Sequence, residues 1–392
     1  MKLVVIGLGQ CGCNIADQFC AINHYSRSFL NRKIAILTDA FAVNTNEADL
    51  GSFKHIQNDK HHRILLGALR TFGHGVGKIN AIATEIIKES HSVVTKNVLQ
   101  SRKSHEADGI IVIASGGGGT GSGTIGWVIK ELKERMGKPV YAIVVLPFGF
   151  EELGDNSYAV TNTATCLKTV NRYADATILL DNERFIRTDI SLAQNFKEIN
   201  QEMAKNFYDL CCAGEERKRK YLGNKVIDAG DIEESLEGIC TIGRGGVDLS
   251  TFYPLRKEEA REAGKQRVSL ATALQKSQNN LSLPIELQDA RKILVLVTAP
   301  KNIITLNGLQ EIATFLQNES PKSVVRIGDY PRRAREVSVT LIAAKLTKVA
   351  RVEKLYLQAE DLFKKQAEIH REAEDQIKQL RETSKNLPTL DC

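Results

Sequence analysis

The fold is decided by the stretch Ser115-Gly116-Gly117-Gly118-Gly119-Thr120-Gly121-Ser122-Gly123. An apolar run rich in β-branched residues, 109–114, precedes it and predicts a buried strand, while 124–132 carries apolar residues at helical spacing. The unit is therefore a strand, a glycine loop and a helix. Glycines let a ligand approach the backbone, and the N–H groups of the loop and of the helix N-terminus place partial positive charge at one spot. Together with the hydroxyls of Thr120 and Ser122, this predicts phosphate binding by residues 115–122.

A second glycine turn lies near the N-terminus, in Gly7-Leu8-Gly9-Gln10-Cys11-Gly12-Cys13-Asn14. It stands between a short apolar run and a helical pattern, so it matches the Gly-x-Gly-x-x-Gly fingerprint of dinucleotide sites. The next predicted strand, 33–37, ends at Thr38-Asp39, and an acid there suits the ribose of a nicotinamide cofactor. An NAD(P)-dependent oxidoreductase is therefore an alternative at this point. Two facing glycine loops, however, suit three consecutive phosphates better than one pyrophosphate.

The octapeptide at 116–123 resembles the signature of the tubulin/FtsZ superfamily of polymerising GTPases, and other stretches resemble its archaeal CetZ branch. The resemblance covers roughly residues 1–250 by motif and the remainder by the order of elements. It implies an α/β protein: a Rossmann-like GTP-binding domain with a parallel sheet, a long central helix, and a second, smaller α/β domain. It also implies that the protein binds GTP and GDP together with Mg²⁺, although no residue is assigned to a metal.

The resemblance assigns further residues to the phosphates and their surroundings. Beside the octapeptide these residues are Gly9, Gln10, Cys11, Gly12, Asn14, Asn44, Gly73, Gly75 and Gly77. Gln10 and Cys11 are placed near the phosphates and the guanine, and Asn44 belongs to the Asn-Thr loop after the second strand. The turn at 73–77 is the one that senses the γ-phosphate in the family. Lys78 adds a cation that faces either a phosphate or solvent.

A smaller set of residues is assigned to the sugar and the base. Glu151 follows a predicted strand at 140–146 and is placed near the ribose hydroxyls by resemblance. Asn182 follows the strand at 176–180, and its amide offers both a donor and an acceptor to the guanine edge. On the long helix predicted over 191–212, Phe196 and Asn200 lie four residues apart on one face. The resemblance assigns this pair to stacking on guanine and hydrogen bonding to its edge.

Two acids follow the long helix, in Val226-Ile227-Asp228-Ala229-Gly230-Asp231-Ile232. Such a pair can orient a water molecule, and the stretch resembles the catalytic loop of FtsZ and the Asp-x-x-Glu of CetZ. The alternative is that Asp228 or Asp231 only caps a helix. A helix of about 20 residues is ~30 Å long, so the acids lie beyond the end that is distant from Phe196. We therefore expect them to act on the nucleotide of a neighbouring copy stacked head to tail, an arrangement that generates a homopolymer.

The sequence predicts four segments. These are a GTP-binding domain over 1–190, a central helix and linker over 191–225, a second α/β domain with the catalytic loop at its start over 226–346, and a C-terminal helix and tail over 347–392. In the second domain, 290–298 and 337–344 are predicted strands, while 261–275 and 309–316 are predicted helices. The tail carries apolar residues at helical spacing, which indicates a helix packed on the body or one that binds a partner.

Composition excludes several classes of protein. The chain has 392 residues, of which 42% are hydrophobic and 26% charged, and no apolar run is long enough to span a bilayer. The first residues run directly into a strand, so we expect no signal peptide. The basic run 217–220 has no interleaved aromatic residues, which argues against a nucleic-acid partner. The eight cysteines lack paired metal-binding spacing, which indicates reduced thiols and a cytoplasmic protein.

The predicted function is that of a GTP-binding, GTP-hydrolysing cytoskeletal protein that polymerises head to tail. The resemblance implies a role in cell shape or division. Two alternatives stay open: the NAD(P)-dependent oxidoreductase described above, and a nucleotide-binding regulator that does not hydrolyse its ligand.

Overall fold

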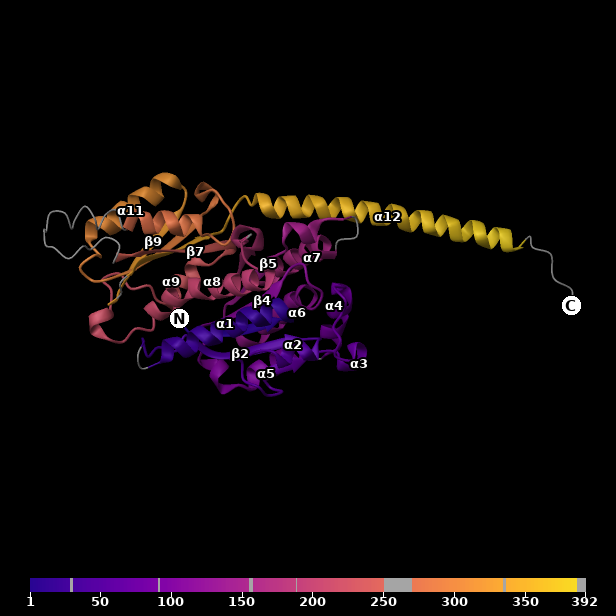
Figure 1. Cartoon of the computed structure of the whole chain (residues 1–392), viewed down its shortest axis with the longest axis horizontal. Helices are drawn as coiled ribbons and strands as arrows, with labels where there is room; N and C mark the ends of the chain where they lie inside the picture. The colour runs from indigo at the N-terminus through magenta and orange to yellow at the C-terminus, as the bar shows by residue number, and fades with distance from the viewer. Residues whose placement is uncertain are drawn as a thin grey trace.

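The computed structural model describes residues 1–28, 31–90, 92–154, 158–187, 189–249, 270–333 and 336–385. Ten strands within these residues form a single sheet, in the order β3-β2-β1-β4-β5-β6-β7-β10-β8-β9 (Figure 1). The strands are β1 (Leu3–Leu8), β2 (Leu37–Asn44), β3 (Arg63–Leu65), β4 (Gly109–Ser115), β5 (Val140–Leu146), β6 (Ala176–Asp181), β7 (Gly238–Asp248), β8 (Lys292–Ala299), β9 (Val324–Pro331) and β10 (Glu336–Ala344).

The first six strands are all parallel to their neighbours. Their central members are apolar along their whole length and are buried on both faces, as in β1 and β5. Because the strands are parallel, the loops that follow them meet at one edge of the sheet, and this edge is where the glycine loops lie. The predicted α/β class is confirmed.

The second strand differs from its prediction. It covers Leu37–Asn44 rather than 33–37, and Val4 of β1 pairs with Asp39. Ile34 and Ile36 are buried in the segment that leads into β2, so their apolar character reflects packing rather than strand pairing. Asp39 consequently lies near the start of β2, distant from the edge where the loops meet.

Helices cover both faces of the sheet. They are α1 (Gly9–Arg27), α2 (Glu47–Gly51), α3 (Ala68–Thr71), α4 (Asn80–Glu89), α5 (Val93–Gln100), α6 (Thr120–Met136), α7 (Tyr158–Tyr173), α8 (Leu192–Ala213), α9 (Ala229–Ser235), α11 (Leu306–Glu319) and α12 (Ala350–Lys385). Short 3-10 turns are η1 (Arg102–Glu106), η2 (Gly149–Glu152), η3 (Asn182–Phe185), η4 (Arg219–Tyr221) and η6 (Leu287–Asp289). One core contains α1 and α8, and a second core on the opposite face contains α4, α6 and α7.

The sheet continues without a break into the C-terminal part of the chain. β7 is parallel to β6 and antiparallel to β10, and β8 and β9 complete this side. A third core joins these strands to α11 and to a helix over 270–279. Of the helix predicted over 261–275, residues 261–269 lie outside the described part, as do 386–392 of the tail. The predicted domain boundaries stay a prediction.

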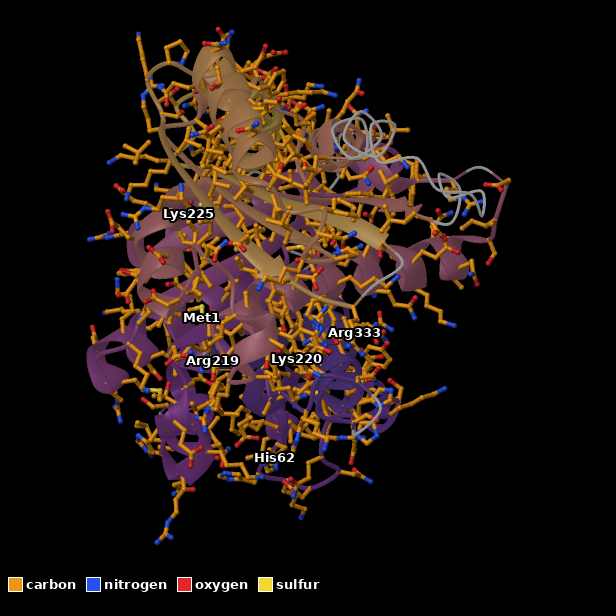
Figure 2. All side chains as sticks on the ribbon, turned by 90° about the vertical axis from the view of Figure 1, so that its left-hand side faces the viewer. Met1, His62, Arg219, Lys220, Lys225 and Arg333 are labelled. Atoms are coloured by element: carbon orange, nitrogen blue, oxygen red, sulfur yellow. The ribbon has the colours of Figure 1, made fainter. Side chains whose placement is uncertain are left out.

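The long helix α8 starts at Leu192, with Ser191 as its cap, and ends at Ala213. The N-terminus of the chain lies beside its end: the Met1 ammonium donates to the carbonyl of Cys211 at 3.1 Å and pairs with Glu215 at 3.1 Å. Figure 2 looks at this end of the molecule and labels Met1 there. A helix of 22 residues is about 33 Å long, so α8 separates this end from the edge with the glycine loops.

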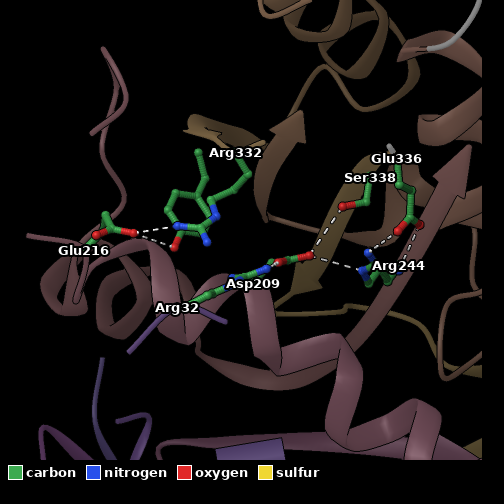
Figure 3. Close-up of polar contacts among 8 residues, drawn as sticks. Arg32, Asp209, Glu216, Arg244, Arg332, Glu336 and Ser338 are labelled. Carbon is green, nitrogen blue, oxygen red and sulfur yellow. Dashed lines mark hydrogen bonds and ion pairs between the residues drawn. The ribbon is translucent and has the colours of Figure 1, made fainter. Parts of the chain in front are cut away.

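Asp209, on the last turns of α8, joins this helix to the segment after α1 and to strands β7 and β10 (Figure 3). Its carboxylate accepts from Arg32, which follows α1, from Arg244 Nε of β7 at 3.2 Å and from Ser338 Oγ of β10 at 3.3 Å. The side chain is 2% exposed. Burial alone would raise the pKa of Asp209, but the charges of Arg32 and Arg244 outweigh it, so the pKa lies below its ordinary value of 3.8.

The C-terminal helix α12 has two different halves. Val352, Leu355, Ala359 and Leu362 are buried, and the last two pack against α7. Beyond this point the side chains with a described environment are exposed, among them Ile369, Ile377 and Leu380. Figure 1 shows this half extending away from the body. Among the helices that the structure describes, none has the length and apolarity to span a membrane.

We predict that Asp209→Asn lowers the free energy of unfolding by about 3–5 kcal/mol, because it leaves two arginines without their buried counter-charge. Urea denaturation would measure the loss. The matched control is Glu202→Gln, which removes the same charge from the same helix at an exposed ion pair with Lys205, and its cost should stay within about 0.5 kcal/mol. Equal losses in the two variants would contradict the role given to Asp209.

A pH dependence follows from the lowered pKa of Asp209. The stabilisation by the Asp209 carboxylate is complete above the pKa of the unfolded state, near 4, and is lost as the pH falls through the lower folded-state pKa. We therefore expect wild type to lose more stability between pH 5 and pH 3 than Asp209→Asn does, as measured by denaturation at each pH.

Candidate functional site

A cavity of about 590 Å³ opens where the loops after the parallel strands meet. Segments from the whole first half of the chain and the start of α8 line it. The lining residues are Leu8, Gly9, Gln10, Cys11, Asn14, Asn44, Asn46, Asp49, Gly75, Val76, Lys78, Ser115, Gly117, Gly118, Gly119, Thr120, Gly121, Glu151, Asn182, Ala193, Phe196 and Asn200. Most of the residues predicted from sequence are therefore brought together in one place.

Five predicted residues do not line this cavity: Gly12, Gly73, Gly77, Gly116 and Ser122. Gly12 is closely packed, because a Cβ there would lie 2.1 Å from the carbonyl oxygen of Ile113. It allows α1 to approach β4 closely. The Ser122 hydroxyl donates back to the carbonyl of Gly118, so it holds the loop in shape.

The two glycine loops face each other across one end of the cavity. Gly9 adopts a φ of +68°, and a Cβ on it would lie 3.1 Å from the backbone nitrogen of Gly121. The first N–H groups of α6 have no partner within the helix and carry its positive dipole end. The hydroxyls of Thr45 and Thr120 lie 2.7 Å apart and join the end of β2 to the glycine loop. This end of the cavity has the geometry of an anion site.

Asn162, on α7, supports this end and was not predicted from sequence. Its amide donates to the carbonyls of Lys78 at 2.8 Å, Gly118 at 3.2 Å and Gly117 at 3.3 Å. It thus ties the turn at 73–78 to the glycine loop. Lys78 itself adopts a φ of +64°, which is uncommon for a residue other than glycine. The sequence carries no clear signal for Asn162, because it stands among the threonines Thr161, Thr163 and Thr165 of the same helix.

Aromatic and amide side chains form the other end of the cavity. The Phe196 ring is 39% exposed and packs edge-on against the buried Phe148, with centroids 5.4 Å apart. Asn182 and Asn200 contribute amides to the same end. The Glu151 carboxylate accepts from the N–H of Phe148 at 3.1 Å. A flat aromatic face beside two amides suits a planar, polar-edged ring.

Arg351, at the root of α12, braces this end from behind and is a second residue missed from sequence. Its guanidinium donates to the carbonyl of Pro147 at 3.1 Å and pairs with Asp181 at 3.3 Å and with Glu152. Asp181 precedes Asn182, and Glu152 follows Glu151, so one arginine fixes both walls. No local motif reveals it, because its partners lie far away in the sequence.

The Cys11 thiol lies in the cavity wall as a neutral group. Burial raises its pKa to about 12, with a smaller contribution from Glu151. At neutral pH it therefore acts as a small packing surface rather than as a nucleophile. The cysteines that the structure describes are all free thiols.

Asp228 and Asp231 lie away from the cavity, beyond the far end of α8, and form the start of α9. Each carboxylate accepts from the other residue's N–H, at 2.9 and 3.3 Å, so the capping role is real. The two acids are nevertheless accessible: Asp228 is exposed, and the Asp231 side chain is 33% exposed beside Arg326. The buried Asp329 accepts from the N–H groups of Asn224 and Lys225, at 3.1 and 2.6 Å, and fixes the loop before them.

The acid expected at a dinucleotide site lies elsewhere. Asp39 accepts from Ser101 and pairs with His62 Nε2 at 3.2 Å, and it does not line the cavity. Asp39 is therefore not placed to contact the ribose of a nicotinamide cofactor held by the first glycine loop.

Metal-binding side chains are sparse near the cavity. In the described parts of the chain, no group of three or more His, Cys, Asp or Glu residues could hold a metal ion. Asp49 lines the cavity, and its carboxylate accepts from Asn44 at 2.9 Å, next to the Thr45 hydroxyl that contacts Thr120.

Comparison with known proteins covers nearly the whole chain. Residues 2–189 match the model of the tubulin/FtsZ family GTPase domain, and residues 189–361 match that of the tubulin-like CetZ C-terminal domain. The tubulin-like protein CetZ3 of Haloferax volcanii is 31% identical, over 91% of this chain and 90% of its own length.

Solved structures give the same picture. The GDP-bound CetZ1 monomer of Haloferax volcanii has a TM-score of 0.77 at 28% identity, covering 92% of this chain and 99% of its own. The GTPγS-bound CetZ2 protofilament from the same organism has a TM-score of 0.80 at 27% identity, covering 94% and 100%.

We predict that Gly12→Ala destabilises the protein and Gly118→Ala does not, because Gly12 is tightly packed whereas Gly118 lines the open cavity. Gly12→Ala must move the Ile113 carbonyl and should cost about 1–3 kcal/mol or more. At Gly118 the nearest atom to a new Cβ is 3.9 Å away, so Gly118→Ala should change stability by less than about 0.5 kcal/mol. Thermal denaturation measures both, and a stable Gly12→Ala would overturn the packing role.

Proposed function

This chain belongs to the tubulin/FtsZ family of cytoskeletal GTPases, in its CetZ branch, and from this premise we propose that it binds GTP, polymerises head to tail and hydrolyses GTP at the contact between copies. The single observation that carries the proposal is the separation of two half-sites. The cavity lies at one end of α8, and the accessible acids Asp228 and Asp231 lie beyond the other.

The cavity supports a guanine nucleotide in one orientation. The facing glycine loops and the start of α6 bind the phosphates, and Phe196 stacks on the base while Asn182 and Asn200 hydrogen bond to its edge. Glu151, held beside Phe148 at the base end of the cavity, accepts from the ribose hydroxyls. The solved CetZ relatives contain GDP and GTPγS, which agrees with this assignment.

Magnesium fits this cavity only as an ion held mainly by phosphates and water. Mg²⁺ keeps several waters and needs one or two carboxylates beside the phosphate oxygens, and Asp49 is the side chain here that would hold it. When bound, the ion supplies positive charge that offsets the charge of the β- and γ-phosphates.

Asp228 and Asp231 complete the site of a neighbouring copy. Their carboxylates orient a water molecule for attack on the γ-phosphate, and Arg326, paired with Asp231 Oδ1 at 2.6 Å, holds that acid in position. A contact between unlike ends repeats without closing, so it builds a filament. The protofilament of CetZ2 supports this mode of assembly. The filament would act in the cytoplasm, in cell shape or division.

The first test is the rate of phosphate release from GTP as the protein concentration rises. The rate per copy should increase with concentration, because each active site needs two copies. A rate that stays flat would contradict the shared site. Asp228→Asn should lower the rate by about 10²- to 10⁴-fold at any concentration, while stability is preserved because Asn caps helices as well as Asp does.

The matched control is Glu233→Gln, which removes the same charge from an exposed position of α9. It should leave the rate unchanged. Mixing sharpens the test: Asp228→Asn copies keep an intact cavity, and Phe196→Ala/Asn200→Ala copies keep intact acids. Each alone should be nearly inactive, and the mixture should recover activity. A mixture without recovery, or an Asp228→Asn protein that turns over GTP like wild type, would favour the non-hydrolysing regulator.

A further inference from the structure

A second cavity lies at the opposite end of the molecule from the nucleotide cavity. It has a volume of about 650 Å³ and is lined by Lys220, Tyr221, Pro300, Lys301, Asn302, Pro331, Arg332 and Arg333. Figure 2 looks at this end and shows Lys220 and Arg333 next to each other, with Arg219 and Lys225 on the same face. Three separate segments therefore bring four cationic side chains to one hollow.

Among the described residues that line this cavity, four are cationic and none is acidic. Glu216, which is 2% exposed behind the cavity, pairs with Arg332 at 2.8 Å and offsets one of the cations. A hollow lined by one sign of charge focuses the electrostatic field and concentrates ions of the opposite sign.

The cavity walls are fixed rather than loose. The Tyr221 ring lies 4.8 Å from Lys220 Nζ and 4.2 Å from the guanidinium carbon of Arg332, so it holds two of the cations. The N–H of Arg332 donates to the carbonyl of Ala299 at 2.8 Å, and a turn bond from Ile303 to Pro300 at 2.9 Å shapes the neighbouring segment. Such preorganised donors lose little entropy when a ligand binds.

We propose that this cavity is an anion site for a chain of phosphate groups, distinct from the nucleotide cavity and beyond the proposed GTPase function. Arginine forks match phosphate oxygens in pairs, and lysines add point charges. The volume is similar to the 590 Å³ of the nucleotide cavity, so several phosphates fit. Because Tyr221 is already engaged by two cations, the cavity recognises the phosphates and not a base.

The location of the site links it to the acids. Asp329, which fixes the loop before Asp228, lies on β9 two residues before the cavity residue Pro331. A bound oligophosphate therefore lies on the end of the molecule that carries the acid pair. In a head-to-tail filament it would neutralise positive charge at the contact.

The test is calorimetric titration of the full-length protein, saturated with GDP, with inorganic tripolyphosphate at low salt. We expect one binding event that weakens steeply as salt is added. Lys301→Glu/Arg333→Glu should weaken it at least tenfold. The control Lys322→Glu/Lys348→Glu makes the same change in net charge at exposed positions elsewhere and should bind like wild type. A second titration with ATP distinguishes a free oligophosphate from the tail of a nucleotide.

Absence of tripolyphosphate binding, or equal loss in the two double variants, would overturn the site. The readout needs neither hydrolysis nor assembly, so a failed GTPase test leaves it intact. If GDP itself does not bind, the proposed function fails. The difference in tripolyphosphate affinity between the two double variants still shows whether the anion site exists.

Discussion

A buried carboxylate, that of Asp209, fixes the relative position of everything else in this protein. It is the point where the end of α1, the helix α8 and the strands β7 and β10 meet, through Arg32, Arg244 and Ser338. An ion pair this deep is costly to desolvate, so it is seldom a route to stability alone. Its contribution here is to fix the position of α8 relative to both halves of the sheet.

That lock matters because α8 acts as a spacer between two pieces of chemistry. Its N-terminal part presents Phe196 to the cavity, and the chain that leaves its last turn leads to Asp228. A rigid spacer of about 33 Å keeps the acids away from the cavity of the same molecule. The nucleotide cavity and the acid pair are therefore held apart within one molecule, and in the proposed mechanism a second copy brings them together.

The sequence predicted local features well and long-range ones poorly. The glycine loop, the strand before it and the α8 pattern are encoded by neighbouring residues, so their positions were confirmed. Gly12 is closely packed and does not line the cavity, and its motif alone does not tell close packing from close binding. The strand β2 was misplaced, since Ile34 and Ile36 are buried outside the sheet. Arg351 and Asn162 were missed because their partners lie far off in the sequence and only the folded chain brings them together.

The two-part helix α12 has a mechanical consequence. Its root is pinned by Arg351 to Asp181 and Glu152, directly behind the residues that face the base end of the cavity. Its outer part, from Phe363 to Lys385, is about 34 Å long. A tilt of about 10° at Phe363, where the helix leaves the body, would move the tip by roughly 6 Å over this length. Any tilt of this helix relative to the body would therefore be largest at its outer end, on the outside of the protein.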